Sequence, residues 1–95
     1  MRLIGKEPLY DFMNKYSDSR SQIESWIAEV EETVWQTPHE LKCRYSSASI
    51  IGGQNVVFNI CGNKYRLWVK TTYKIGVVLI KKIGTHDEYI KWNIR

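Results

Sequence analysis

The chain has 95 residues, 43% of them hydrophobic, with a formal net charge of +4 at pH 7 and a pI of about 9.1. This length fits a single domain, residues 1–95, with one small core. No apolar run is long enough to cross a membrane and no secretory leader is recognisable, so a soluble cytoplasmic protein is expected. Cys43 and Cys61 are the only cysteines and lack C-x-x-C spacing, which indicates reduced thiols rather than a disulfide framework.

The charge is divided unevenly along the chain. Residues 1–40 carry four basic and eight acidic side chains, a net charge of −4. From residue 41 onward ten basic side chains face only Asp87 and Glu88, a net charge of +8. The second half is therefore expected to hold an anionic partner, with nucleic acid as the first candidate.

Two amphipathic helices are predicted in the acidic half. Pro8 suits a first helical turn, and apolar side chains follow at the spacing of one helix face: Leu9, Phe12, Met13 and Tyr16. Ser17 and Asp18 end this helix, and Ser19 to Gln22 have the spacing of a capping box that opens a longer helix. The apolar face of that helix comprises Ile23, Trp26, Ile27, Val30 and Val34.

The basic half predicts a short helix and a meander of strands. Thr37 to Glu40 form a second capping box, so a short helix is expected to about Arg44. Strands are expected at residues 48–51, 56–60, 64–72 and 77–83, separated by glycine-containing turns, and Leu3 with Ile4 can add a small edge strand. The apolar run 77–83 belongs in the middle of the sheet.

A last capping box, Thr85 and Glu88, predicts a final helical segment that ends near Arg95. Helices followed by a meander indicate an α+β fold, in which the amino-terminal helices pack on one face of a small antiparallel sheet.

The predicted strand 64–72 has two unlike faces. Side chains alternate along a strand, so the core face holds Tyr65, Leu67 and Val69, and the other face holds Lys64, Arg66, Trp68 and Lys70. Three cations and an indole suit a phosphate backbone and a stacked base. Lysines that only keep an exposed sheet soluble are the alternative interpretation.

Acid–base chemistry has one candidate close to this face. His86 carries the side chain that exchanges protons near neutral pH, and Tyr89 lies one helical turn later. Cleavage of RNA without a metal needs a base for the 2′-hydroxyl, an acid for the departing 5′-oxygen and a cation such as Arg66. The alternative is that His86 only occupies the first turn after a cap and Tyr89 packs on the sheet. His39 and His86 lack metal-ligand spacing, and no phosphate-binding loop occurs, so no metal and no cofactor are predicted.

Three segments give the chain a family resemblance: Val57 to Ile60, Gly62 to Leu67, and Gly84-Thr85-His86-Asp87-Glu88-Tyr89. They resemble the HigB toxins, a branch of the RelE-like ribosome-dependent mRNA interferases of type II toxin–antitoxin systems. The resemblance implies a microbial-RNase-like α+β fold, endoribonuclease cleavage of mRNA in the ribosomal A site, and neutralisation by a HigA-like helix-turn-helix antitoxin.

The resemblance also implies residue roles. Arg66 matches the phosphate-stabilising arginine, His86 stands where relatives carry a His or Arg, and Lys64 lies among the cations of the cleft. Together with Tyr89, which helical spacing alone puts near His86, they are the expected catalytic residues. The expected RNA-binding residues are Lys42, Arg44, Trp68, Lys70, Lys81 and Lys82. Ile90 replaces a common acidic residue and Trp68 a common aliphatic one. A non-catalytic RNA-binding module and a domain that binds an acidic peptide remain open, and cyclic-phosphate ends would separate the enzyme from both.

Overall fold

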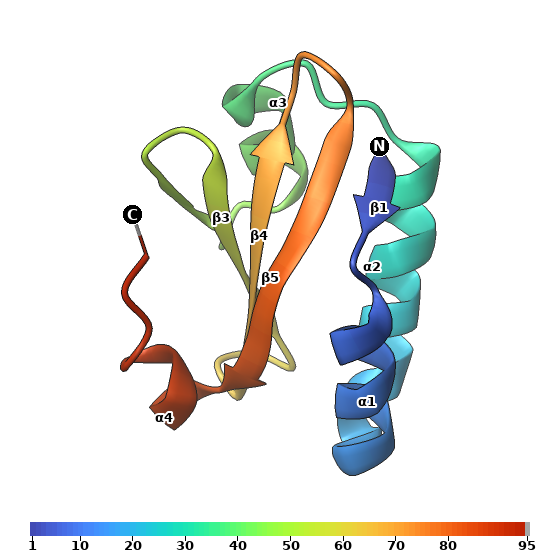
Figure 1. Ribbon diagram of the computed structural model, residues 1–95, viewed down its shortest axis with the longest axis vertical. Coiled ribbons are helices and arrows are strands. Elements are labelled where there is room, and N and C mark those ends of the chain that lie inside the picture. Colours follow the sequence, from blue (N-terminus) through green and yellow to red (C-terminus); the bar gives the residue numbers. More distant parts are fainter. Residues whose placement is uncertain (95) are drawn as a thin grey trace.

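The computed structural model describes residues 1–94 and contains four α-helices, one 3₁₀ turn and five strands (Figure 1). In chain order they are β1 (Arg2–Ile4), α1 (Glu7–Lys15), η1 (Ser17–Ser19), α2 (Arg20–Glu32), α3 (Pro38–Arg44), β2 (Ser49–Ile51), β3 (Asn55–Ile60), β4 (Tyr65–Thr72), β5 (Val77–Thr85) and α4 (His86–Tyr89). Figure 1 shows α1 and α2 along one side of the sheet, and α4 with the carboxyl-terminal segment on the other side. The predicted α+β class is confirmed.

The five strands form one sheet in the order β1-β5-β4-β3-β2, so β4 is central. The meander from β2 to β5 is antiparallel, as predicted, whereas β1 pairs with β5 in parallel and makes the sheet mixed. Three α-helices and the turn η1 separate β1 from the meander, and a connection of that length allows strands to pair in the parallel direction. β5 lies between β1 and β4, which confirms its interior position.

The apolar faces of α1 and α2 form the core with the facing side of β3 and β4. Its members include Leu9, Met13, Ile23, Val30, Val56, Leu67 and Val69, each at most 1% exposed. The prediction that Val34 belongs to this face was wrong, because α2 ends at Glu32 and Val34 is 68% exposed. Thr33 has extended backbone angles, so the chain leaves the helix there and buries Trp35 instead.

Two of the three predicted caps are confirmed. Thr37 accepts from the Glu40 backbone N–H at 3.2 Å, and Thr85 and Glu88 form a reciprocal capping box at the start of α4. The prediction for Ser19 was wrong: η1 precedes α2, and the buried Ser19 hydroxyl donates to the Tyr16 carbonyl at 2.7 Å. α4 ends at Tyr89 rather than near Arg95, and Arg95 lies outside the described residues.

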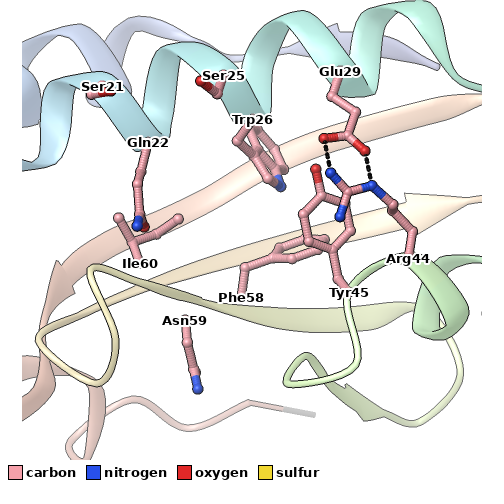
Figure 2. Close-up of a pocket in the computed structure, with 10 residues that line it drawn as sticks. All are labelled: Ser21, Gln22, Ser25, Trp26, Glu29, Arg44, Tyr45, Phe58, Asn59 and Ile60. Carbon is pink, nitrogen blue, oxygen red and sulfur yellow. Dashed lines mark hydrogen bonds and ion pairs between the residues drawn. The ribbon is translucent and has the colours of Figure 1, made fainter.

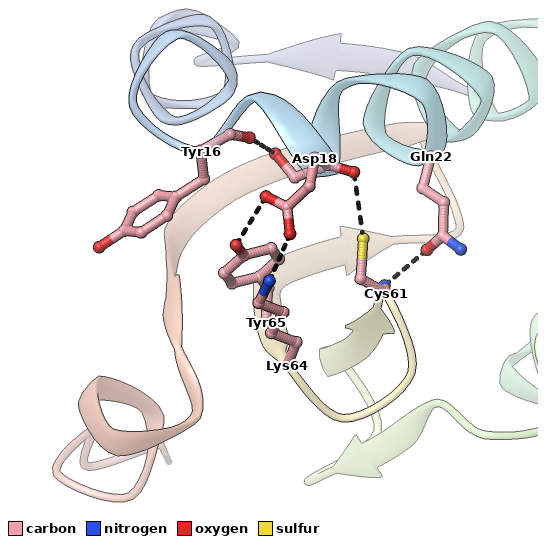
Figure 3. A network of polar contacts seen from close by, with 7 residues as sticks. Tyr16, Asp18, Gln22, Cys61, Lys64 and Tyr65 are labelled. Atoms are coloured by element: carbon pink, nitrogen blue, oxygen red, sulfur yellow. Dashed lines mark hydrogen bonds and ion pairs between the residues drawn. The ribbon is translucent and has the colours of Figure 1, made fainter.

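The loop between β3 and β4 contains four residues, Cys61 to Lys64, because Ile60 pairs directly with Tyr65. Cys61 and Gly62 have positive φ angles of 53° and 67°. A left-handed conformation is costly for a cysteine, and the Cys61 backbone N–H donates to the Gln22 side chain at 2.6 Å, which anchors the loop to α2 (Figure 3). β4 therefore begins at Tyr65 and not at Lys64.

Candidate active site

The face of the sheet away from α1 and α2 carries most of the predicted site residues. On β4, Arg66, Trp68 and Lys70 alternate with the buried Leu67 and Val69, as predicted. Trp68 pairs with Lys82 while Val69 pairs with Ile80, so the register skips Lys81 in a β-bulge. Lys81 Nζ lies 5.7 Å from the Trp68 ring. The bulge thus brings Lys81 and Lys82 to the same side as Trp68. We call this surface, made by Arg66, Trp68, Lys70, Lys81 and Lys82, the outer face.

Arg66 is held rigidly at one end of the outer face. The residue is 9% exposed, and Nη1 donates to the backbone carbonyls of Asn63 at 2.8 Å and Tyr65 at 3.3 Å. The guanidinium carbon lies 5.2 Å from the centre of the Tyr89 ring, and such a contact stabilises a cation by about 0.5–2 kcal/mol. Within residues 1–94, both hydrogen bonds of this side chain use Nη1. Nε and Nη2 are therefore available to an anion, in the fork geometry that suits phosphate.

α4 places Tyr89 against this arginine and His86 beside Tyr89. The Thr85–Glu88 capping box starts the helix, and the His86 backbone N–H donates to the Lys64 carbonyl at 3.1 Å. The His86 side chain is exposed, and its ring centre lies 6.1 Å from that of Tyr89. The hydrogen bond from the Thr85 backbone N–H to the Glu88 carboxylate lowers the pKa of Glu88. This carboxylate therefore serves to cap the helix. Tyr89 thus contacts both Arg66 and His86, and the catalytic roles of the three side chains stay predictions.

Trp92 is a member of this cluster that the sequence reasoning missed. A further turn after α4, with the Trp92 backbone N–H on the Tyr89 carbonyl at 3.0 Å, carries the indole back over the sheet. Its ring lies 5.8 Å from Tyr89 and 6.2 Å from Trp68. A Cβ at Gly84 would approach the Trp92 ring to 3.1 Å, so a side chain there would require the ring to shift by a few tenths of an ångström. The three-residue spacing of His86, Tyr89 and Trp92 was the available signal.

Lys64 does not lie on the outer face, and that prediction was wrong. It belongs to the β3–β4 loop, and its ammonium binds the Asp18 carboxylate at 2.5 Å on the helical side (Figure 3). The Tyr65 hydroxyl donates to the same carboxylate at 2.8 Å. The hydrogen bonds from Lys64 and Tyr65 lower the pKa of Asp18, and the hydrogen bond to Asp18 raises the pKa of Lys64. The prediction failed because β4 begins at Tyr65, one residue later than predicted. The alternation of side chains along a strand does not extend to Lys64 in the preceding loop.

Lys42 and Arg44 are also engaged elsewhere. The Lys42 ammonium donates to the Ala48 carbonyl, and Arg44 forms an ion pair with Glu29 of α2. Arg44 lies at a cavity of about 230 Å³ between α2, α3 and β3, on the helical side of the sheet (Figure 2). Tyr45 lines this cavity, and burial raises the pKa of its phenol. Because the outer face is the other side of the sheet, Arg44 is not part of the Arg66 cluster.

The described residues contain no group of three or more His, Cys, Asp or Glu side chains placed to hold a metal ion. Within residues 1–94, no helix is long and apolar enough to cross a membrane. The candidate site contains a buried arginine, an exposed imidazole, a phenol and a row of lysines.

Two comparisons with known proteins bear on this arrangement. The chain is 28% identical over 92 residues to the protein CHROMATIN REMODELING 4 of Arabidopsis thaliana, and the match covers 95% of the chain but only 4% of that much longer protein. A family profile described as HigB_toxin, the RelE-like toxic component of a toxin–antitoxin system, matches residues 19–92. That match includes β2 to β5, the whole of α4 and Trp92. The chain therefore belongs to the HigB toxin family, the RelE-like toxic components of toxin–antitoxin systems.

Proposed function

We propose that this toxin is an endoribonuclease that cleaves mRNA on the translating ribosome and thereby inhibits translation. The observation that carries the proposal is the Arg66 guanidinium, which belongs to a buried residue, is braced by Tyr89 and has two nitrogen donors free, while the exposed His86 contacts the same Tyr89 ring. A donor that is fixed before the reaction stabilises charge that develops in the transition state without reorganising. An arginine that served only general RNA affinity would not need such bracing.

The proposed reaction is a transfer within the RNA backbone. The 2′-oxygen attacks the adjacent phosphorus, the bond from phosphorus to the 5′-oxygen breaks, and the products are a cyclic phosphate and a 5′-hydroxyl. Arg66 neutralises the additional charge on the phosphoryl oxygens. His86 either removes the 2′-hydroxyl proton or donates a proton to the 5′-oxygen, and the Tyr89 hydroxyl orients the attacking group. The other proton is exchanged with water or with a group of the ribosome, so the proposed cleavage needs no metal ion.

The proposed partners follow from the family. The mRNA is presented by the ribosome, and a HigA-like helix-turn-helix antitoxin neutralises the toxin by covering the outer face or by blocking its entry into the A site. We expect expression of the chain alone to arrest growth, and co-expression of its antitoxin to restore it.

Primer extension on mRNA from cells that express the chain tests the proposal. New 5′ ends should appear within translated reading frames, and they should disappear when initiation on the same message is blocked. Purified protein should release cyclic-phosphate ends from ribosome-bound mRNA and leave the same RNA intact without ribosomes. A protein that binds the message and produces no new ends is a non-catalytic RNA-binding module, and the proposal is then wrong.

The paired lysines give a first quantitative prediction. Replacement of Lys81 and Lys82 by alanine removes two cations from the outer face, so affinity for single-stranded RNA should fall. The slope of log K against log salt should become shallower by roughly 0.7 for each phosphate contact that is lost. Fluorescence anisotropy at several salt concentrations measures this slope. An unchanged slope would show that these lysines do not contact the RNA backbone.

The Asp18–Lys64 ion pair gives a second prediction. Asp18→Asn removes the carboxylate that holds Lys64, so the ammonium can turn to an RNA phosphate and binding should strengthen, with a salt slope steeper by roughly 0.7. Since the folded pKa of Asp18 is lowered, the ion pair stabilises the wild type above the ordinary carboxylate pKa and is lost as the pH falls through the lowered value. The Tm of the wild type should fall on acidification partly because this ion pair is lost. The Tm of Asp18→Asn should therefore fall less over the same pH range. If binding and the melting profile stay unchanged, Lys64 is not restrained by Asp18 in solution.

A further inference from the structure

We infer that a hollow at the carboxyl-terminal end of the chain binds one nucleobase of the RNA next to the phosphate held by Arg66. The inference rests on the proposed function. The hollow has a volume of about 430 Å³ and is lined by Ile51, Tyr89, Ile90, Trp92, Asn93 and Ile94. Two aromatic rings and three isoleucines make a site for a flat, largely apolar group.

Tyr89 connects the hollow to the phosphate site. Its ring centre lies 5.2 Å from the Arg66 guanidinium carbon and 5.8 Å from the Trp92 ring centre, and Tyr89 itself lines the hollow. A phosphate on Arg66 and a base on Trp92 are therefore separated by about one aromatic ring. This separation matches a phosphate and a base of the same or the adjacent nucleotide, so single-stranded RNA can occupy both sites at once.

Trp92 is supported from the sheet in the way that a stacking platform requires. Its ring packs against Gly84, where the absence of a side chain leaves room, and it lies 6.2 Å from Trp68 with the ring planes inclined by 35°. Trp68 is fixed in turn by the hydrogen bond from its Nε1 to the Asn55 side chain at 3.0 Å. A ring that is already ordered loses little conformational entropy when a base stacks on it.

The chemistry of the hollow indicates which nucleobases it prefers. Stacking on an indole accepts any base, because every base has a flat face, and a larger ring system gains more contact. Among residues 1–94, the side chains that line the hollow are aromatic, aliphatic or amide groups, which contact a base face rather than a phosphate. We therefore expect a preference for purines over pyrimidines at one nucleotide position.

A thermodynamic cycle with a modified RNA tests the inference. The probe is a short 2′-O-methyl oligoribonucleotide, which cannot be cleaved, together with a series in which each base in turn is removed to leave an abasic site. Removal of one particular base should weaken wild-type binding by about 5- to 100-fold. Trp92→Leu should weaken binding of the intact probe by a similar factor and make the variant indifferent to that abasic site, because both changes remove the same contact. Trp92→Phe should restore much of the lost affinity.

Ile75→Ala truncates an exposed apolar side chain at the turn between β4 and β5, at the opposite end of β5 from α4, and should bind every probe like the wild type. If Trp92→Leu keeps wild-type affinity, or if its losses simply add to those of the abasic probes, the base site is wrong even when the protein cleaves ribosome-bound mRNA. If the cycle shows coupling while the wild type fails to cleave, the base site stands and the nuclease proposal falls.

Discussion

Arg66→Ala is expected to reduce cleavage of ribosome-bound mRNA by about 100-fold or more, and to weaken RNA binding as well. The variant loses the fork of donors that faces the phosphate, and removal of one donor of this type costs about 2.7–4 kcal/mol of transition-state stabilisation. It also leaves the Asn63 and Tyr65 carbonyls without the bonds from Nη1 and removes the cation beneath Tyr89. Single-turnover cleavage rates and a thermal melt separate the lost chemistry from lost stability.

Two further variants make this test specific. Arg66→Lys keeps the positive charge but not the planar fork, so it should remain far below the wild-type rate. Arg20→Ala removes an arginine from α2, where its ion pair with Glu24 is long at 3.7 Å and both side chains are largely exposed. Such a pair contributes little to stability, so this control should cleave normally. Full activity of Arg66→Lys would mean that only net charge matters at this position.

His86→Gln should abolish most of the cleavage while leaving folding and ribosome binding nearly intact. A positioned general acid or base contributes roughly 10²- to 10⁴-fold to the rate. Glutamine keeps polarity and approximate size but cannot transfer a proton. His86 is exposed, and its backbone bonds to Lys64 and Ile90 do not depend on the side chain, so the helix should still form. Single-turnover rates, ribosome co-sedimentation and Tm are the measurements.

His39→Gln is the matched control, since His39 is the other histidine of the chain and lies exposed on α3. It should cleave at the wild-type rate. If His86→Gln also does so, His86 is only the residue after a helix cap. The proton transfers must then be assigned to Tyr89, to a lysine or to the ribosome.

The spacing of apolar residues predicted most of the secondary structure correctly, because local patterns decide it. The stripes that begin at Leu9 and Ile23 became buried helix faces, and the alternation from Tyr65 to Lys70 separated the core face from the outer face. Thr37 and Thr85 began helices as their capping boxes indicated. The failures at Ser19 and Val34 lie at helix ends, where one residue decides whether a turn continues and where packing outweighs propensity.

The sequence by itself determined the class of fold, the cationic outer face and the turn that presents His86 and Tyr89, since alternation, charge and capping act over a few residues. Only the tertiary structure decided which basic side chains are available to bind RNA and which are held in ion pairs. The length of the β3–β4 loop turned Lys64 toward Asp18, and the pairing of α3 with α2 placed Arg44 on Glu29. The return of the chain after α4 put Trp92 beside Tyr89 and Trp68. Each of these contacts joins residues whose proximity depends on how whole elements pack, and such proximity is not encoded in local spacing.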